Sequence, residues 1–220
     1  MRMTLGILGM KKNRIYETVV STYDKKQRPA AAAMGIMLIN EETFFIRPFK
    51  TTSTYANLNE TKCGVVNISS SPQIFYRTTF KHEEPRLRIP SKWYAPAKTV
   101  LAPRIKLAEA HVEFTVRSLE VENEDRTRLT CKAKFMEGRR IFPQAYCRSN
   151  YALIECIIHA TRVKYHLSHG RVAEAQKLIN LIRYYRNLAI RVSPSSKDVQ
   201  MIEEILSHVG RWRKEDGGLR

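Results

Sequence analysis

The sequence predicts an α+β fold, in which a small antiparallel six-stranded β-barrel is followed by a C-terminal three-helix region. Up to about residue 142, short apolar and β-branched segments alternate with turn residues at the spacing of hairpins. After Pro143 the hydrophobic period changes from two residues to 3.6, which indicates helices. No βαβ rhythm is visible, so a parallel sheet is not expected. The change of period predicts two domains, at 1–145 and 146–220.

The first predicted strand is the segment RIYETVVSTY at 14–23, whose side chains alternate between two faces. The sequence DKKQRP then supplies a hairpin turn. Further strands are predicted at 30–39, 43–49, 63–69, 106–122 and 126–137. Six strands are enough to close a small barrel, which leaves no unpaired edge. Four prolines in the segment 80–104 indicate an ordered loop or a lid rather than regular structure.

Three helices are predicted in the last third of the chain. The first carries a broad apolar stripe and ends at Gly170, and the second begins at Val172. The third follows Ser195, whose spacing to Asp198 is that of a capping box. These helices make up the predicted C-terminal domain.

Composition predicts an anionic partner and no metal. The 220 residues carry a formal net charge of +17, which favours a phosphate, a nucleotide, a nucleic acid or a membrane surface. The four cysteines and six histidines show no metal-ligand spacing, so we expect reduced thiols and no zinc site. The longest apolar run, 30–39, is about half a membrane span. We therefore expect a soluble, cytoplasmic protein without a membrane partner.

The segment RPFKTTSTYANL at 47–58 is a candidate phosphate site, because it follows a predicted strand and leads into a predicted helix. A helix that begins near Thr52 presents unpaired N–H groups and the positive end of its dipole. Arg47 can donate to two phosphate oxygens, and Lys50 adds a point charge. The alternative is that the residues from Thr51 to Thr54 only cap the helix and that both cations lie on the surface.

Several motifs resemble one known family. They are NRIYETVVSTY at 13–23, Met34-Gly35, RPFKTTST at 47–54, VVNIS at 65–69 and YCRSNYALIECIIHATR at 146–162. In this order they resemble the archaeal flavin-bound split-barrel family that is known as domain of unknown function 447. The resemblance covers most of the chain. It has two departures, since Ala33 replaces a common proline and Cys147 replaces an asparagine that commonly precedes the arginine matched by Arg148.

The resemblance implies a flavin-reductase-like split barrel that holds FMN, at the interface of a homodimer. It implies that the FMN phosphate is surrounded by Arg47, Lys50, Thr51, Thr52, Ser53 and Thr54. It further implies that the isoalloxazine edge is lined by Met34, Gly35, Val66 and Asn67, and that Arg148 approaches from the helical end. The alternative for Asn67 is a turn residue at the end of a strand.

No catalytic residue is identified from the sequence. His111 and Glu113 share one strand face and suit acid–base chemistry, but a structural role fits them equally. A flavin carries its own redox chemistry, so an FMN enzyme needs no such signature. Three functions remain, namely an FMN-dependent oxidoreductase, a non-catalytic FMN carrier or sensor, and a basic nucleic-acid-binding protein. The last lacks an exposed aromatic stripe for base stacking.

Overall fold

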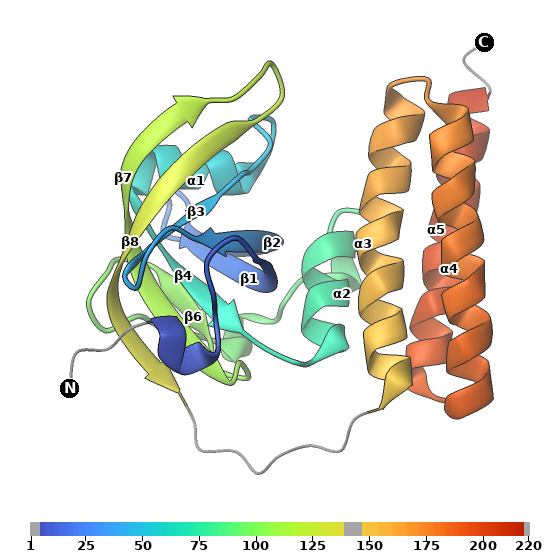
Figure 1. Ribbon diagram of the computed structural model, residues 1–220, viewed down its shortest axis with the longest axis horizontal. Helices are drawn as coiled ribbons and strands as arrows, with labels where there is room; N and C mark the ends of the chain where they lie inside the picture. The colour runs from blue at the N-terminus through green and yellow to red at the C-terminus, as the bar shows by residue number, and fades with distance from the viewer. Residues whose placement is uncertain (1–4, 139–146, 218–220) are drawn as a thin grey trace. The chain divides into compact units, whose positions relative to one another are not determined.

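The computed structural model describes residues 5–138 and 147–217. These residues form two compact units, one made of 5–70 and 88–138 and the other of 71–87 and 147–217. The predicted domain boundary at 145/146 lies outside the described residues. Figure 1 labels the elements of both units.

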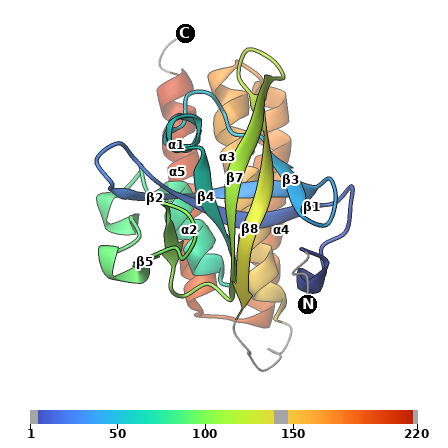
Figure 2. The same ribbon diagram turned by 90° about the vertical axis from the view of Figure 1, so that its left-hand side faces the viewer.

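The first unit contains a closed six-stranded antiparallel barrel, as the sequence predicts. The strands are β1 (Ile15–Tyr23), β2 (Pro29–Leu38), β3 (Thr43–Ile46), β4 (Cys63–Ile68), β7 (Ala110–Val121) and β8 (Thr127–Gly138), in the spatial order β1-β2-β3-β8-β7-β4. Figure 2 shows the long strands β7 and β8 side by side. Because β3 pairs with β8, Ile46 lies opposite Leu129, and segments far apart in sequence become neighbours. A short 3-10 helix, η1 (Leu5–Leu8), precedes the barrel, and α1 (Ser53–Thr61) connects β3 to β4.

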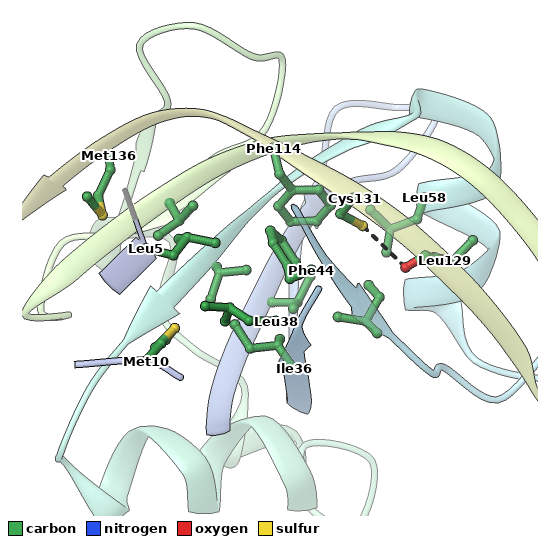
Figure 3. Close-up of a cluster of buried hydrophobic side chains, with 14 residues drawn as sticks. Leu5, Met10, Ile36, Leu38, Phe44, Leu58, Phe114, Leu129, Cys131 and Met136 are labelled. Atoms are coloured by element: carbon green, nitrogen blue, oxygen red, sulfur yellow. Dashed lines mark hydrogen bonds between the residues drawn. The ribbon is translucent and has the colours of Figure 1, made fainter. Parts of the chain in front are cut away.

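The barrel core is built from the inward-facing residues of all six strands (Figure 3). Phe44 and Phe114 are fully buried and meet edge to face, with 5.4 Å between ring centroids. Gly64 makes room for Phe114, because a Cβ at that position would lie 2.7 Å from Phe114 Cζ. The Phe114 ring therefore fills the space that a side chain at residue 64 would need.

The proline-rich segment contains regular structure, contrary to the expectation of a loop without any. It forms 3-10 helices η2 (Pro85–Leu87) and η3 (Ser91–Trp93) and a two-stranded sheet of β5 (Tyr94–Pro96) and β6 (Pro103–Ile105). Ser21 Oγ donates to the Pro103 carbonyl at 2.5 Å, and the Ile105 N–H donates to Asn67 Oδ1 at 2.7 Å. Strands of three residues carry no readable period, and these two depend on side chains of the barrel wall.

The second unit consists of α2 (Pro72–Phe80), α3 (Arg148–Ser168), α4 (Val172–Val192) and α5 (Lys197–Gly217). The three C-terminal helices are those predicted, whereas α2 was not. The predicted capping box at Ser195 is wrong: Ser196 Oγ accepts from the Val199 N–H at 3.3 Å, and Asp198 accepts from Ser149 Oγ at 2.8 Å. None of the helices in the described residues is long and apolar enough to cross a membrane.

A buried histidine of α5 packs against α2 in the helical unit. The His208 ring is 1% exposed and stacks on Phe80, with 5.2 Å between centroids. Burial and the nearby Arg211 lower the pKa of His208 from its usual value of 6.5, against the opposing effect of Glu83, Glu84 and Glu204. The folded state therefore holds this imidazole in its neutral form.

We expect the helical unit to lose stability as pH falls below about 6.5. Because folding lowers the pKa of His208, the unfolded chain takes up the proton at a higher pH than the folded chain does. The contribution of His208 to the free energy of unfolding is therefore complete above pH 6.5. Below that pH it declines, by at most about 1.4 kcal/mol per pH unit. The measurement is urea unfolding of a Trp93→Phe protein between pH 8 and 5.5, followed by Trp212 fluorescence. His208→Phe should reduce the dependence of the free energy of unfolding on pH, whereas His169→Gln, at an exposed site, should leave it as in wild type. An equal slope in His208→Phe would contradict the assignment.

Candidate functional site

The connection from β3 to α1 forms the helix start that the sequence predicts. Thr52 is the N-cap, with its Oγ1 accepting from the Tyr55 N–H at 3.3 Å and donating to the Phe49 carbonyl at 2.7 Å. Among the described residues, no acceptor takes the N–H groups of Ser53 and Thr54. Two backbone donors at the positive end of α1 therefore point away from the helix.

The hydroxyl groups of this connection differ in exposure. Thr51 and Ser53 are exposed and Thr52 is half-buried. Thr54 is only 3% exposed, so its side chain packs inward and it offers a ligand its N–H group alone. The segment thus combines free backbone donors with two exposed hydroxyls.

Both predicted cations contact the turn between β7 and β8. Arg47 Nε lies 2.9 Å from Glu122 Oε1, and Lys50 Nζ donates to the Asn123 carbonyl at 2.8 Å. The Lys50 N–H also donates to the Asp125 carbonyl at 2.8 Å. The ion pair of Arg47 uses Nε and leaves its two terminal nitrogens available to an anion.

Two further arginines reach the same place, Arg128 from β8 and Arg126 from the position just before this strand. Arg126 Cζ lies 4.0 Å from the centroid of the Phe49 ring, and Arg128 Cζ lies 4.2 Å from that of Phe45. Arg47 Cζ lies 4.9 Å from the same Phe45 ring. Neither arginine was predicted as a site residue, although the pattern Arg-Thr-Arg at 126–128 places both on one face of an extended chain. Their proximity to Arg47 depends on the pairing of β3 with β8, which local sequence does not reveal.

The residues predicted to line a flavin ring lie on β2 and β4. Met34 is half-buried, and its carbonyl accepts from Thr18 Oγ1 at 2.8 Å. A Cβ at Gly35 would lie 3.0 Å from Ile15 Cγ2, so the missing side chain leaves room beside that isoleucine. The structure brings these two residues together with β1, where Met34 pairs with Thr18 and Gly35 with Glu17.

Val66 and Asn67 are both 0% exposed. Val66 belongs to the barrel core. The Asn67 amide donates to the Val19 carbonyl at 2.9 Å and to Ser21 Oγ at 2.8 Å, and its oxygen accepts from the Ile105 N–H. In this structure neither side chain is available to a ligand.

Arg148 is the first residue of α3 and is exposed. Cys147 occupies the N-cap position and makes no side-chain cap hydrogen bond. An asparagine there would be a strong N-cap, so the departure from the family pattern removes a helix-capping group as well as an amide.

The model of a known family matches residues 16–141, and its description is "Protein of unknown function (DUF447) N-terminal domain". The match covers more than half of the 220 residues. The chain belongs to this family.

Solved structures also resemble this DUF447 chain. The crystal structure of an FMN-bound DUF447 protein from Methanosarcina mazei matches with a TM-score of 0.74 and 23% identity, covering 93% of this chain and 99% of that one. This similarity confirms the fold. The 2-nitrobenzoate 2-nitroreductase of Pseudomonas fluorescens matches with a TM-score of 0.48 and 19% identity over 60% of this chain and 68% of that one. The NADH:FAD oxidoreductase of Streptomyces globisporus matches with a TM-score of 0.46 and 16% identity, over 64% of this chain and 86% of that one.

His111 and Glu113 hold the β5–β6 segment against the barrel of this DUF447 chain. Glu113 is fully buried, and its carboxylate accepts from the N–H groups of Lys98 and Thr99 at 2.7 and 2.6 Å. His111 Nε2 donates to the Ile105 carbonyl at 2.8 Å. Both side chains therefore have structural partners, which favours the structural alternative over acid–base catalysis.

A cavity of about 360 Å³ lies beside His111 in the same unit. Its lining residues are Arg104, Lys106, His111, Glu137 and Gly138. Glu137 pairs with Arg104 and, at 2.5 Å, with Lys98. Glu137 thus compensates the charge of two cations beside this cavity, whereas no ion pair is formed by Arg126 or Arg128 within the described residues.

Proposed function

We propose that this chain binds FMN and that the FMN phosphate occupies the start of α1. The observation that carries the proposal is the donor set at 47–54: two free N–H groups at a helix start, two exposed hydroxyls and two cations held beside them. The fold is shared with an FMN-bound DUF447 protein along 93% of the chain, which supports a flavin rather than another phosphorylated ligand.

The donor set fits a phosphate monoester well. A dianion accepts several hydrogen bonds at once, and the site supplies them from the backbone, from Thr51 and Ser53 and from the terminal nitrogens of Arg47. Glu122 orients the Arg47 side chain through Nε. For the ring we propose a position beside Met34 and Gly35, with Val66 and Asn67 supporting the wall from inside.

For the reaction we propose an FMN-dependent oxidoreductase. When bound, FMN supplies hydride or electron transfer at its N5 atom. The residues of this chain bind the phosphate, orient the ring and limit its contact with water.

A non-catalytic FMN carrier or sensor is a second candidate. It is favoured by the engagement of His111 and Glu113 with the β5–β6 segment, which leaves neither as an acid–base group. Anaerobic stopped-flow mixing with NADH and NADPH separates the two: an oxidoreductase should bleach the flavin within seconds, whereas a carrier should be reduced only by light or dithionite.

We expect the purified protein to bind FMN more tightly than riboflavin, because riboflavin lacks the phosphate. Arg47→Ala should weaken FMN binding by about 1.5–3 kcal/mol, or one to two decades in Kd, and leave riboflavin binding unchanged. Thr52→Ala should weaken FMN binding less than Arg47→Ala does, since the backbone donors remain. The measurement is a fluorescence titration of both flavins.

Arg14→Ala, at an exposed site in the same unit, is the control and should bind as wild type does. Equal affinity for FMN and riboflavin in wild type and in Arg47→Ala would reject the phosphate site. Tight, salt-dependent binding of RNA without any flavin would instead favour the nucleic-acid alternative.

We also propose a homodimer in the cytoplasm. The dimer is supported by Ile15, which is 63% exposed beside Gly35 on the outer face of the barrel. The location is supported by four free cysteines, which suit a reducing compartment. Sedimentation at micromolar concentration tests the dimer, and a monomer that still holds FMN would refute it.

A further inference from the structure

Arg126 and Arg128 lie on aromatic rings without an acidic partner. Each guanidinium stacks over a phenylalanine, Arg126 over Phe49 and Arg128 over Phe45. Within the described residues, no carboxylate forms an ion pair with either arginine, whereas Arg28, Arg47, Lys98, Arg104 and Lys132 of the same unit each pair with one. Arg128 Nε is buried and has no hydrogen-bond partner. A buried donor without an acceptor is unfavourable, so the side chain of Arg128 is not stabilised by protein hydrogen bonds at Nε.

Arg128 and Arg47 are close to each other because they share one ring. Their guanidinium carbons lie 4.2 and 4.9 Å from the centroid of Phe45, so their separation is smaller than the sum of these distances. Two cations at this range repel each other, and Glu122 compensates only Arg47. An anion that accepts from both guanidinium groups removes the repulsion, and the Phe45 ring packs against both groups.

Backbone contacts join these arginines to the start of α1. The Thr127 N–H donates to the Pro48 carbonyl at 3.3 Å, and Phe49 forms an isolated bridge with Arg126. The carbonyl of Phe49 accepts from the hydroxyl of Thr52, the N-cap of α1. Residues 126–128, which carry both arginines at the start of β8, are thus tied to the segment that carries the free N–H groups.

We propose that Arg126 and Arg128 are phosphate-binding residues that determine the preference of this site for a phosphate monoester. The inference rests on the proposed FMN site and adds to it the two arginines at the start of β8. Arg47 and Lys50 are partly engaged by the turn that precedes β8, so the charges left without a partner for a dianion are those of Arg126 and Arg128.

The test compares Arg126→Gln, Arg128→Gln and the double variant with wild type. Glutamine keeps part of the side chain over the ring but removes the charge. Each single variant should weaken FMN binding roughly tenfold to hundredfold and change riboflavin binding less than about twofold. Inorganic phosphate should compete with FMN in wild type and lose this ability in the double variant. Arg117→Gln, an exposed arginine on β7, is the matched control.

Arg128→Lys is the conservative variant and should recover part of the affinity for FMN, since the charge remains while the planar fork is lost. If FMN and riboflavin affinities fall together in the glutamine variants, the arginines only support the fold and the inference is overturned. It is also overturned if the variants keep the full preference for FMN. A wild-type protein that does not prefer FMN would overturn the proposed function itself, which is a different result.

Discussion

Phe114→Ala is expected to lower the free energy of unfolding of the barrel unit by about 3–5 kcal/mol. The ring is fully buried and contacts Phe44 edge to face in the centre of the barrel core (Figure 3). Its loss leaves a cavity that the surrounding strands cannot fill, because each is held by ladder hydrogen bonds on both sides. Urea unfolding of a Trp212→Phe protein, followed by Trp93 fluorescence, reports on this unit.

A double-mutant cycle with Gly64→Ala tests the packing directly. Alone, Gly64→Ala should cost about 1–3 kcal/mol, because the new Cβ meets Phe114 Cζ at 2.7 Å and Leu58 Cδ2 at 3.2 Å. In the Phe114→Ala background that clash with the ring is absent, so the same change should cost much less. Additive effects of the two substitutions would show that residue 64 and the ring are not in contact.

Glu113→Ala is expected to destabilise the barrel unit by about 2–4 kcal/mol and to release the β5–β6 segment. The substitution removes the acceptor for the N–H groups of Lys98 and Thr99 and for Thr99 Oγ1. Unfolding measured by Trp93 fluorescence gives the free energy, and hydrogen exchange at residues 94–105 gives the local opening.

Two variants make the result interpretable. Glu113→Gln keeps one acceptor oxygen and should lie between wild type and Glu113→Ala, while Glu120→Ala, exposed on the same strand, should change little. Unchanged exchange at 94–105 in Glu113→Ala would mean that other contacts hold the segment.

The parts of the fold that repeat a short period were predictable from the sequence. The six barrel strands and the three long helices each carry enough residues for the period to be read, and Thr52 shows the local chemistry of an N-cap. β5 and β6 have three residues each and carry no period. Their stability comes from Ser21, Asn67 and Glu113, which lie on distant strands.

The candidate site was predictable only in the half that is continuous in sequence. In the segment 47–54, a predicted strand followed by hydroxyl residues indicates the hydrogen-bond donors. Arg126 and Arg128 join it through the pairing of β3 with β8, a contact between residues about eighty positions apart that no local pattern contains. The burial of Asn67 could not be predicted for the same reason. The residue that donates to its side chain, Ile105, lies far from it in the sequence.

The pairing of β3 with β8 also sets when a nascent chain can first hold the proposed ligand. β3 is synthesised early, but its partner strand begins at Thr127, after every other strand of the barrel. Until β8 has left the ribosome, the barrel has open edges at β3 and β7, and Arg126 and Arg128, which we propose to bind the anion, are absent. Once β8 has docked, a ligand held by both strands binds only the closed barrel and opposes its reopening. Cofactor supply during translation would then act as a folding aid whose effect begins only at this last pairing step.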